Sequence, residues 1–210
     1  MDFDYFLTHI SKLKELPLGG LDSQFKMAPE LRKKYSLKDI EDQKPKESAV
    51  LALFYPDNNQ TTNILLMLRA SYNGVHSAQI SFPGGKKDDH DNDLEFTALR
   101  ETEEEIGISR TEITIIRKLT KTYIPPSNFW VTPFIGILDN TPTFTTNNEV
   151  EKLIEVPINE LLDDDRLISK NLTTSYMKNI DVPCFKLNNY TVWGATAMML
   201  SEIKDLLKSL

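Results

Sequence analysis

The sequence has one cysteine, no apolar run of membrane-spanning length, and fewer basic than acidic side chains. The lone cysteine, Cys184, excludes an internal disulfide framework and fits a reducing compartment. No apolar stretch approaches the roughly 20 residues that a membrane-spanning helix needs. The net charge of -7, from 24 basic and 31 acidic side chains, argues against non-specific binding to nucleic acid or to an anionic membrane. We therefore expect neither nucleic acid nor membrane as a partner.

The remaining composition is typical of a folded cytoplasmic protein. Its 210 residues are enough for one domain with a sizeable core, and 40% hydrophobic with 26% charged residues is a globular composition. The acidic start, Met1-Asp2-Phe3-Asp4, is wrong for a secretory signal peptide. The last residues, Lys208-Ser209-Leu210, are not in the order of a peroxisomal signal. These features favour a cytoplasmic location.

The first 47 residues differ in pattern from the rest. Apolar residues recur at three- and four-residue spacing from residue 2 to residue 16, which predicts one amphipathic helix. Its apolar face must pack either on its own domain or on a second copy of the chain in a homodimer. Residues 21 to 47 are polar, and we interpret them as a connecting arm with a short helix near residues 29 to 35. The sequence thus divides into a helix and arm, 1–47, and a main domain, 48–210.

Residues 48 to 210 alternate between strand-like and helical patterns. Apolar runs predict a hairpin from 49–55 and 63–68, strands at 112–117, 130–138 and 149–157, and a helix start at 158–162. Two further strands are predicted within 183–192, on either side of a turn at Asn188-Asn189. A final helix is expected to follow Trp193, interpreted as a core anchor, and to run through Leu207. Together with a central helix, these elements fit an α/β/α sandwich with a mixed β-sheet.

The central helix is bounded by clear sequence signals. Asn92 is a good N-cap with Glu95 at the capping-box position, and Gly107 can adopt the left-handed conformation that ends a helix. Upstream, Gly84 and Gly85 form a turn whose backbone can approach a ligand closely and present N–H groups to an anion. Joined to an acidic helix, this turn predicts half of a diphosphate site.

Three glutamates share one arc of this helix. At about 100° per residue, Glu101, Glu104 and Glu105 fall within roughly 100° of one another, while Thr102 and Ile106 face the core. Like charges at helical neighbour spacing destabilise a helix, so something must offset them. A hard divalent cation is the natural candidate, because Mg²⁺ binds carboxylate oxygens and leaves positions for water and phosphate. The structural alternative is that these glutamates form a solvent-exposed acidic face of the helix and bind no metal.

This segment resembles the Nudix box, G-x5-E-x7-R-E-U-x-E-E-x-G-U, where U is a bulky apolar residue. Arg100-Glu101, Glu104-Glu105 and Gly107-Ile108 match in register. Thr102 replaces an apolar residue and Asp91 replaces the mid-motif glutamate. The interval from Asp91 to Arg100 is one residue longer than the general pattern.

The departures resemble the coenzyme A diphosphatase branch of the Nudix family. That branch has the extra residue and an upstream L-L-T-x-R-[S/A] … H-x-G-Q-[I/V]-S-F-P-G-G signature. Here the chain reads Leu65-Leu66-Met67-Leu68-Arg69-Ala70 and then His76-Ser77-Ala78-Gln79-Ile80-Ser81-Phe82-Pro83-Gly84-Gly85. Met67 stands where the branch prefers Thr, and Ala78 where it prefers Gly. The resemblance covers about residues 48 to 200, including Trp193-Gly194-Ala195-Thr196-Ala197.

The resemblance implies a Nudix fold with a catalytic loop-helix-loop, and hydrolysis of a nucleoside diphosphate linked to another group. In this branch the substrate would be coenzyme A or an acyl derivative, cut to 4'-phosphopantetheine and adenosine 3',5'-bisphosphate. Mg²⁺ or Mn²⁺ held by Glu101, Glu104 and Glu105 would neutralise phosphate oxygens and lower the pKa of a bound water. Either Glu105 or Glu149 would take the proton, and Arg100 would orient a neighbouring carboxylate.

Substrate contacts are expected from Arg69, His76, Gln79, Gly84 and Gly85. Each has a structural alternative: Arg69 as a surface charge, His76 as a hydrogen-bonded structural histidine, and the glycines as an ordinary turn. Glu149 is a candidate for either the base or an additional metal ligand, and its structural alternative is an exposed loop glutamate.

Three other functions stay open at this point. The nearest is a Nudix hydrolase of another substrate, such as ADP-ribose or a dinucleoside polyphosphate. A second is a catalytically silent nucleotide sensor on the same fold, against which the intact glutamate triplet argues. The third is an interaction protein whose acidic helix merely faces solvent.

Overall fold

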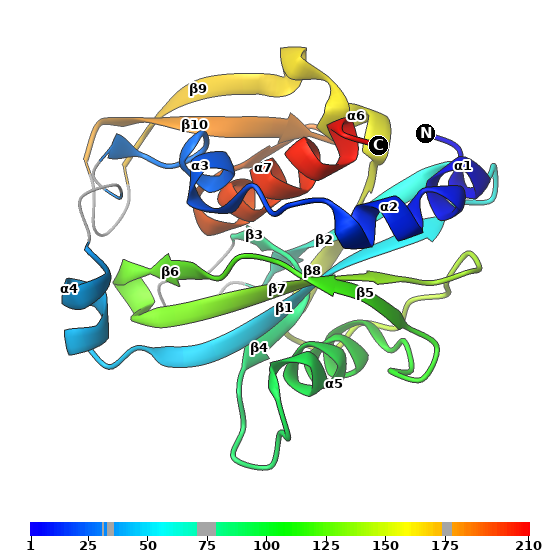
Figure 1. Ribbon diagram of the computed structural model, residues 1–210, viewed down its shortest axis with the longest axis horizontal. Helices are drawn as coiled ribbons and strands as arrows, with labels where there is room; N and C mark the ends of the chain where they lie inside the picture. The colour runs from blue at the N-terminus through cyan, green and yellow to red at the C-terminus, as the bar shows by residue number, and fades with distance from the viewer. Residues whose placement is uncertain (31, 33–35, 71–78, 174–177) are drawn as a thin grey trace.

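A large mixed sheet lies between two helical layers in the computed structural model, which describes residues 1–30, 32, 36–70, 79–173 and 178–210 (Figure 1). Its described helices are α1 Phe3–Thr8, α2 Ile10–Glu15, α3 Gly20–Phe25, α4 Leu37–Asp42, α5 Leu94–Ile106, α6 Ile158–Leu162 and α7 Gly194–Lys208. Its described strands are β1 Lys46–Pro56, β2 Thr62–Arg69, β3 Ile80–Ser81, β4 Gly84–Lys86, β5 Thr114–Lys118, β6 Thr122–Ile124, β7 Phe129–Ile137, β8 Val150–Pro157, β9 Leu167–Leu172, β10 Ile180–Leu187 and β11 Tyr190–Val192. Two 3₁₀ turns, Pro125–Ser127 and Asp164–Arg166, complete the set of described elements.

The main sheet runs in the order β3-β2-β1-β7-β5, with β4 paired to β1, β6 to β7 and β8 to β2. Strand β1 is antiparallel to β2 and β4 but parallel to β7, so the sheet is mixed. A second, antiparallel sheet has the order β11-β10-β9. The hairpin of β1 and β2 confirms the one predicted from the two apolar runs.

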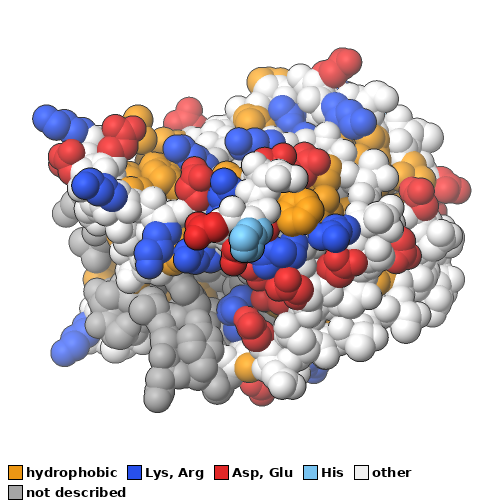
Figure 2. Space-filling view, turned by 90° about the horizontal axis from the view of Figure 1, so that it is seen from below, with side chains coloured by type: hydrophobic (Ala, Val, Ile, Leu, Met, Phe, Trp, Pro, Cys, Tyr) orange, Lys and Arg blue, Asp and Glu red, His pale blue; other side chains and the backbone are white. Residues whose placement is uncertain are grey.

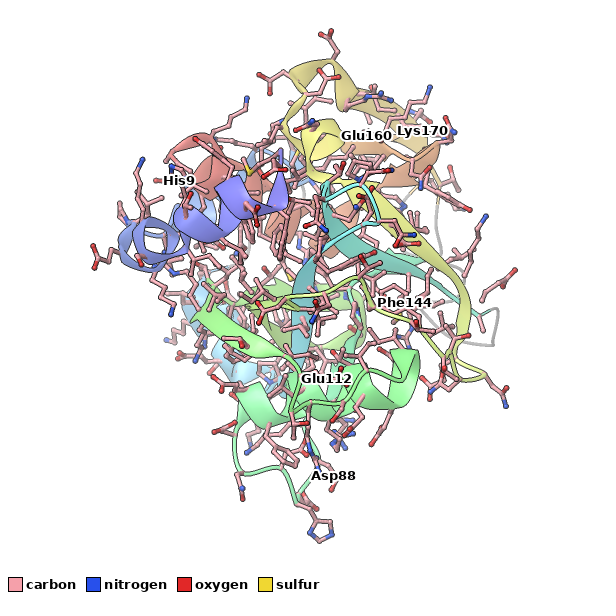
Figure 3. The ribbon with its side chains drawn as sticks, turned by 90° about the vertical axis from the view of Figure 1, so that its right-hand side faces the viewer. His9, Asp88, Glu112, Phe144, Glu160 and Lys170 are labelled. Atoms are coloured by element: carbon pink, nitrogen blue, oxygen red, sulfur yellow. The ribbon has the colours of Figure 1, made fainter. Side chains whose placement is uncertain are left out.

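Side chains of β1 alternate between two cores on opposite faces of the sheet. Leu51 and Leu53 belong to the cluster that includes Ala98 and Ile106 of α5. Phe54 belongs to the larger cluster, which also holds residues of α1, α2 and α7. Because both faces are covered, β1 reads as a nearly continuous apolar run. The predicted α/β/α sandwich is confirmed; Figure 3 shows His9, in the α1–α2 layer, and Asp88, beyond α5, at opposite ends of the molecule.

The predicted single N-terminal helix is two short helices that break at His9. There the His9 N–H donates to Phe6 O at 3.1 Å, and not to the carbonyl of Tyr5 four residues back. The Tyr5 carbonyl instead accepts from the Thr8 hydroxyl at 2.7 Å and contacts His9 Nδ1 at 2.8 Å, a side-chain competition that interrupts helices. Phe6 is buried in the main core, so this apolar face packs on its own domain.

The connecting arm contains more structure than its sequence predicts. Helix α3 begins at Gly20 and runs into the predicted arm, and α4 begins at a Ser36 capping box with Asp39. Helix α3 buries Ser23 and Gln24, polar residues that hydrogen-bond to other elements, so it lacks the apolar stripe by which helices are recognised. The helix expected near residues 29 to 35 falls largely outside the described residues.

Of the two predicted ends of α5, the C-terminal end is correct and the N-terminal end is shifted by one residue. The N-cap is Asp93 and not Asn92, because Asp93 Oδ1 accepts the Phe96 N–H at 2.7 Å. At the other end Gly107 has the predicted left-handed conformation, with φ of 73°. Two strands of the smaller sheet turn at Asn188 and Asn189, both at positive φ, as predicted. Among the described helices, none is long and apolar enough to cross a lipid bilayer.

Two left-handed glycines offer a matched stability test. A Cβ on Gly107 would lie 2.7 Å from Thr145 O, whereas one on Gly20 would meet nothing within 4 Å. Gly20→Ala should therefore cost only the left-handed strain, about 1–2 kcal/mol of unfolding free energy. Gly107→Ala should cost more than that, because strain and a backbone clash add. Urea denaturation measures both, and equal losses would contradict the close packing of Thr145.

Candidate active site

Glu105 lies at the centre of the candidate site, on the sheet-facing side of α5. Its side chain is 2% exposed, and its Oε2 accepts the Gly84 N–H at 2.7 Å. Its other oxygen, Oε1, lies 3.2 Å from Arg69 Nη1, while Arg69 Nη2 lies 3.2 Å from Glu149 Oε2. Residues far apart in the sequence, from β2, β4, α5 and the loop before β8, are thereby brought together.

Arg100 is engaged by three carboxylates, in keeping with the orienting role predicted for it. Its Nε and Nη2 donate to the two oxygens of Asp91 at 2.8 and 2.9 Å. Its Nη2 also lies 3.0 Å from Glu101 Oε1, and its Nη1 lies 3.2 Å from Glu104 Oε2. The hydrogen bonds from Arg100 hold the pKa of the buried Asp91 well below its usual range. Asp91, the residue that departs from the motif, thus fixes the arginine rather than facing the cavity.

The two glycines of the β4 turn are close to backbone and to carboxylate. Gly84 has φ of 142°, and a Cβ there would lie 2.3 Å from Ala49 O. A Cβ on Gly85 would lie 2.4 Å from Glu101 Cδ. The lack of side chains therefore lets β4 pair with β1 and lets the Glu101 carboxylate lie against the turn.

Burial and mutual repulsion raise the pKa values of the inner carboxylates. Burial raises the pKa of Glu105 to about 7, against the opposing effects of the Gly84 N–H and Arg69, and with additional repulsion from Glu101 and Glu149. Burial also raises the pKa of Glu101, with Glu104 and Glu149 adding to it and Arg100 opposing it. These four carboxylates therefore form one electrostatically coupled group.

The donor set suits a hard divalent cation, but the oxygens do not converge on one point. Within the ranges that the structure describes, no group of three or more His, Cys, Asp or Glu side chains is arranged to hold a metal ion. Arginines contact the carboxylates instead. Glu104, for example, forms an ion pair with Arg100, and its side chain is 54% exposed. The grouping of Glu101, Glu104 and Glu105 around an ion stays a prediction, supported by the carboxylate chemistry. The face carrying α5 has interspersed acidic and basic side chains (Figure 2).

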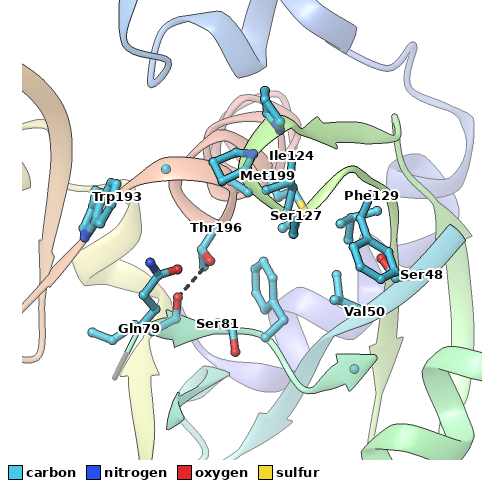
Figure 4. A pocket seen from close by; sticks show the side chains of 18 of the residues that line it. Ser48, Val50, Gln79, Ser81, Ile124, Ser127, Phe129, Trp193, Thr196 and Met199 are labelled. Atoms are coloured by element: carbon cyan, nitrogen blue, oxygen red, sulfur yellow. Dashed lines mark hydrogen bonds between the residues drawn. The ribbon is translucent and has the colours of Figure 1, made fainter. Parts of the chain in front are cut away.

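A cavity of about 950 Å³ opens beside these residues. Arg69, Gln79, Gly84 and Gly85, four of the five predicted substrate residues, line it. The fifth, His76, lies outside the described residues. Most of the other lining side chains are apolar and come from distant parts of the chain (Figure 4).

Trp193 corrects one sequence interpretation. It is only half-buried and lines the cavity, although it also packs against the small cluster of Val182 and Cys184. Phe129 and Met199 line the cavity as well and were not singled out from sequence. No local pattern marks them, because core and cavity positions on a strand or helix have the same apolar character.

A mixed sheet between helical layers, with an acidic helix packed against a Gly-Gly turn, defines a Nudix-type domain. A family model described as the NUDIX domain matches residues 45–176. The chain belongs to the Nudix hydrolase family, whose members act on diphosphate bonds in nucleoside diphosphate derivatives and generally use divalent metal ions.

Curated relatives support this assignment. Nudix hydrolase 22, chloroplastic, of Arabidopsis thaliana is 32% identical over 164 residues, which are 75% of this chain and 54% of the plant protein. The chain therefore spans about half the length of that relative. An uncharacterized Nudix hydrolase, NudL, of Yersinia pestis is 34% identical over 141 residues, 67% of this chain and 70% of the bacterial protein.

Solved structures share the fold at low sequence identity. The Nudix hydrolase RenU of M. smegmatis has a TM-score of 0.55 at 16% identity, covering 79% of this chain and 88% of RenU. A binary complex of the C. elegans Ap4A hydrolase has a TM-score of 0.52 at 18% identity, covering 79% of this chain and 99% of that one. Identities this low establish the architecture alone.

The raised pKa of Glu105 predicts how the metal-free protein responds to pH. Between pH 4.5, the usual pKa of a glutamate, and pH about 7, Glu105 holds a proton in the folded state that it has lost in the unfolded state. This stabilisation is fully present below pH about 4.5 and is lost as pH rises through about 7. Glu105→Gln should remove the loss, so its unfolding free energy should fall less between pH 5 and 8, by on the order of 2–3 kcal/mol.

Urea denaturation in EDTA at pH 5 and pH 8 measures this difference. Glu95→Gln, on the exposed first turn of the same helix, is the matched control and should keep the wild-type pH dependence. Parallel pH dependences for Glu105→Gln and wild type would contradict the strong burial of this carboxylate.

Proposed function

We propose that the protein is a metal-dependent coenzyme A diphosphatase of the cytoplasm. It hydrolyses the diphosphate of coenzyme A, or of an acyl derivative, to 4'-phosphopantetheine and adenosine 3',5'-bisphosphate. The observation that supports this most is that Arg69, Gln79, Gly84 and Gly85 line one cavity beside Glu105. These residues belong to the signature that resembles the coenzyme A branch. A buried, unpaired Cys184 is in keeping with a reducing compartment.

In this proposal the carboxylates of Glu101, Glu104 and Glu105 hold Mg²⁺ or Mn²⁺. The bound ion supplies charge neutralisation at the phosphate oxygens and lowers the pKa of a water molecule. Arg100, locked by Asp91, orients Glu101 and Glu104 through the contacts described above. The glycine turn, whose Gly84 N–H is taken by Glu105, lets the backbone approach the diphosphate closely because it carries no side chains.

We assign the proton-accepting role to Glu105, with Glu149 as the second candidate. Glu105 is buried at the turn, where the Gly84 N–H and Arg69 hold its carboxylate in a fixed position, as a general base requires. The Glu149 side chain is 64% exposed and, among the described residues, forms an ion pair with Arg69. Comparing Glu105→Gln with Glu149→Gln separates the two, because loss of the base abolishes the pH-dependent rise in kcat.

Arg69 has a double role in this proposal. Without metal it neutralises Glu105 and Glu149, and a bound cation would replace it there. The guanidinium, which already lines the cavity, is then available to a substrate phosphate.

A nucleotide panel tests the substrate. With Mg²⁺ or Mn²⁺ the purified protein should cut coenzyme A faster than ADP-ribose or a dinucleoside polyphosphate, with both products identified by mass spectrometry. Glu104→Gln should lower kcat by at least about 100-fold, the upper range seen for residues that only orient metal ligands. Glu103→Gln, one residue away and off the arc, should keep wild-type activity.

Each alternative function has its own result in this panel. Faster cleavage of ADP-ribose or a dinucleoside polyphosphate would identify another Nudix substrate. Nucleotide binding with no turnover of any substrate would indicate a silent sensor. Full activity of Glu104→Gln would contradict the role of the acidic arc and would support the alternative of an interaction protein.

The double role of Arg69 predicts opposite effects on substrate and metal. Arg69→Gln should raise KM for coenzyme A by roughly 10-fold, because a charge-assisted contact of about 1.5–3 kcal/mol is lost. The same change should leave Mn²⁺ binding as tight or tighter, because a competing cation is removed. Calorimetric titration with Mn²⁺ alone checks the second point, and weaker Mn²⁺ binding would show that Arg69 instead supports the metal site.

A further inference from the structure

The cavity has two walls that come from outside the matched NUDIX segment. The family match covers residues 45–176, yet Pro29 and Gln43 line the cavity from the N-terminal side and Met199 lines it from α7. In Figure 4 the side chains of Thr196 and Met199 lie across the hollow from the strand that carries Val50. The matched segment supplies the glycine turn, Arg69 and further apolar lining such as Phe129, and the outer segments complete the enclosure.

The two outer segments are fastened together through Glu202 of α7. Its side chain is fully buried and accepts hydrogen bonds from Gly20 N at 3.0 Å, Gln24 Nε2 at 3.2 Å and Thr120 Oγ1 at 2.6 Å. A buried carboxylate is costly unless its oxygens are hydrogen-bonded, and here both are. Such a satisfied network holds α3 and α7 in one relative position.

The far end of the N-terminal segment is fixed to the main sheet. Gln43 Oε1 accepts from the Tyr123 hydroxyl at 2.8 Å, and Gln43 O accepts from Asn128 Nδ2 at 2.9 Å. Tyr123 and Asn128 flank the Pro125–Ser127 turn, whose residues also line the cavity. The wall is therefore held at both ends, by α7 and by the connection from β6 to β7.

The chemistry of the enclosed space favours a chain that is mostly hydrocarbon. The described lining contains four charged side chains, Arg32, Asp39, Arg69 and Lys86. A second sugar or nucleotide would bury many hydroxyls and amides that need partners, whereas each buried CH₂ gains about 0.8 kcal/mol. Two buried hydroxyls of the lining, on Ser81 and Ser127, have no hydrogen-bond partner among the described residues. The lining also has uncharged polar side chains, such as Gln43 and Gln79, which suit a chain with a few amide groups.

We propose that the N-terminal segment and α7, joined through Glu202, form a wall that selects the acyl chain of a coenzyme A thioester. The proposal rests on the coenzyme A activity proposed above and adds which group occupies the apolar space and which segments contact it. The acyl-pantetheine part extends from the diphosphate at Gly84 along the wall that includes Met199 and Gln43. Acyl-chain preference is then a property of residues outside the matched domain.

Adjacent methionines of α7 provide the first test. Met199 lines the cavity, whereas Met198 is equally buried in the main core and does not line it. Met199→Ala should raise the ratio of kcat/KM for palmitoyl over octanoyl coenzyme A by roughly 10-fold, as a hydrophobic pocket discriminates chain length. Met198→Ala should lose comparable stability by thermal unfolding and leave this ratio unchanged.

A pair of substitutions at exposed positions provides the second test; Gln43→Trp adds bulk at the cavity and also removes the acceptor of the Tyr123 hydroxyl. Gln43 and Glu41 are both exposed near the end of α4, but only Gln43 lines the cavity. Gln43→Trp should lower kcat/KM for palmitoyl coenzyme A by roughly 10-fold, with the value for free coenzyme A changed by less than about twofold. Glu41→Trp should change neither value.

The outcomes separate this inference from the proposed function. If the wild-type protein cuts coenzyme A but Met199→Ala and Gln43→Trp have the chain-length profiles of their controls, the wall does not contact the acyl chain and this inference is overturned alone. If the wild-type protein cuts no coenzyme A species, both proposals fail. Shifted profiles in both cavity variants, with unshifted controls, support the selecting wall.

Discussion

The candidate site depends on one contact, the hydrogen bond from the Gly84 N–H to the buried carboxylate of Glu105. It joins the glycine turn to the acidic helix and places a negative group where water is largely excluded. Alone, such a group would be strongly disfavoured. Arg69 on one side and the backbone donor on the other make it tolerable, and the raised pKa of Glu105 shows that the compensation is incomplete. A site with uncompensated negative charge is suited to a cation.

Around this contact the arginines act as internal counter-ions. Arg69 bridges Glu105 and Glu149, while Arg100 bridges Asp91, Glu101 and Glu104. In each case one guanidinium serves several carboxylates, which its planar array of donors allows. The metal-free fold thereby keeps a crowded acidic group without unfolding its own helix. Binding of a cation would exchange these contacts rather than create order from disorder.

Different segments of the chain line the cavity and carry the residues of the candidate site. The residues proposed to carry the chemistry lie on the main sheet, on α5 and on the loop before β8, whereas part of the cavity wall comes from the first 43 residues and from α7. The walls are joined to each other through Glu202 and to the main sheet through Gln43, and these contacts do not involve Glu105. In the proposed function, substrate preference and diphosphate chemistry would therefore depend on different contacts.

Much of the fold was predictable from local patterns. The apolar run of β1, the hairpin with β2, the Gly107 cap and the Asn188-Asn189 turn each follow from periodicity or from backbone preference. The errors have equally local causes. The break at His9 results from side chains that compete for one carbonyl, and α3 was missed because it buries polar residues. Neither feature has an apolar pattern to reveal it.

By itself the sequence predicted which residues carry the chemistry, because a glutamate arc, its arginine and a glycine turn have a spacing that helical geometry and backbone freedom require. Only the tertiary structure decided that Asp91 holds Arg100, that Arg69 spans Glu105 and Glu149, and that Trp193 and Met199 line a cavity. These contacts join residues that are near in space but come from separate elements. Ion pairs and cavity walls depend on how elements pack, and packing leaves no mark on the local order of residues.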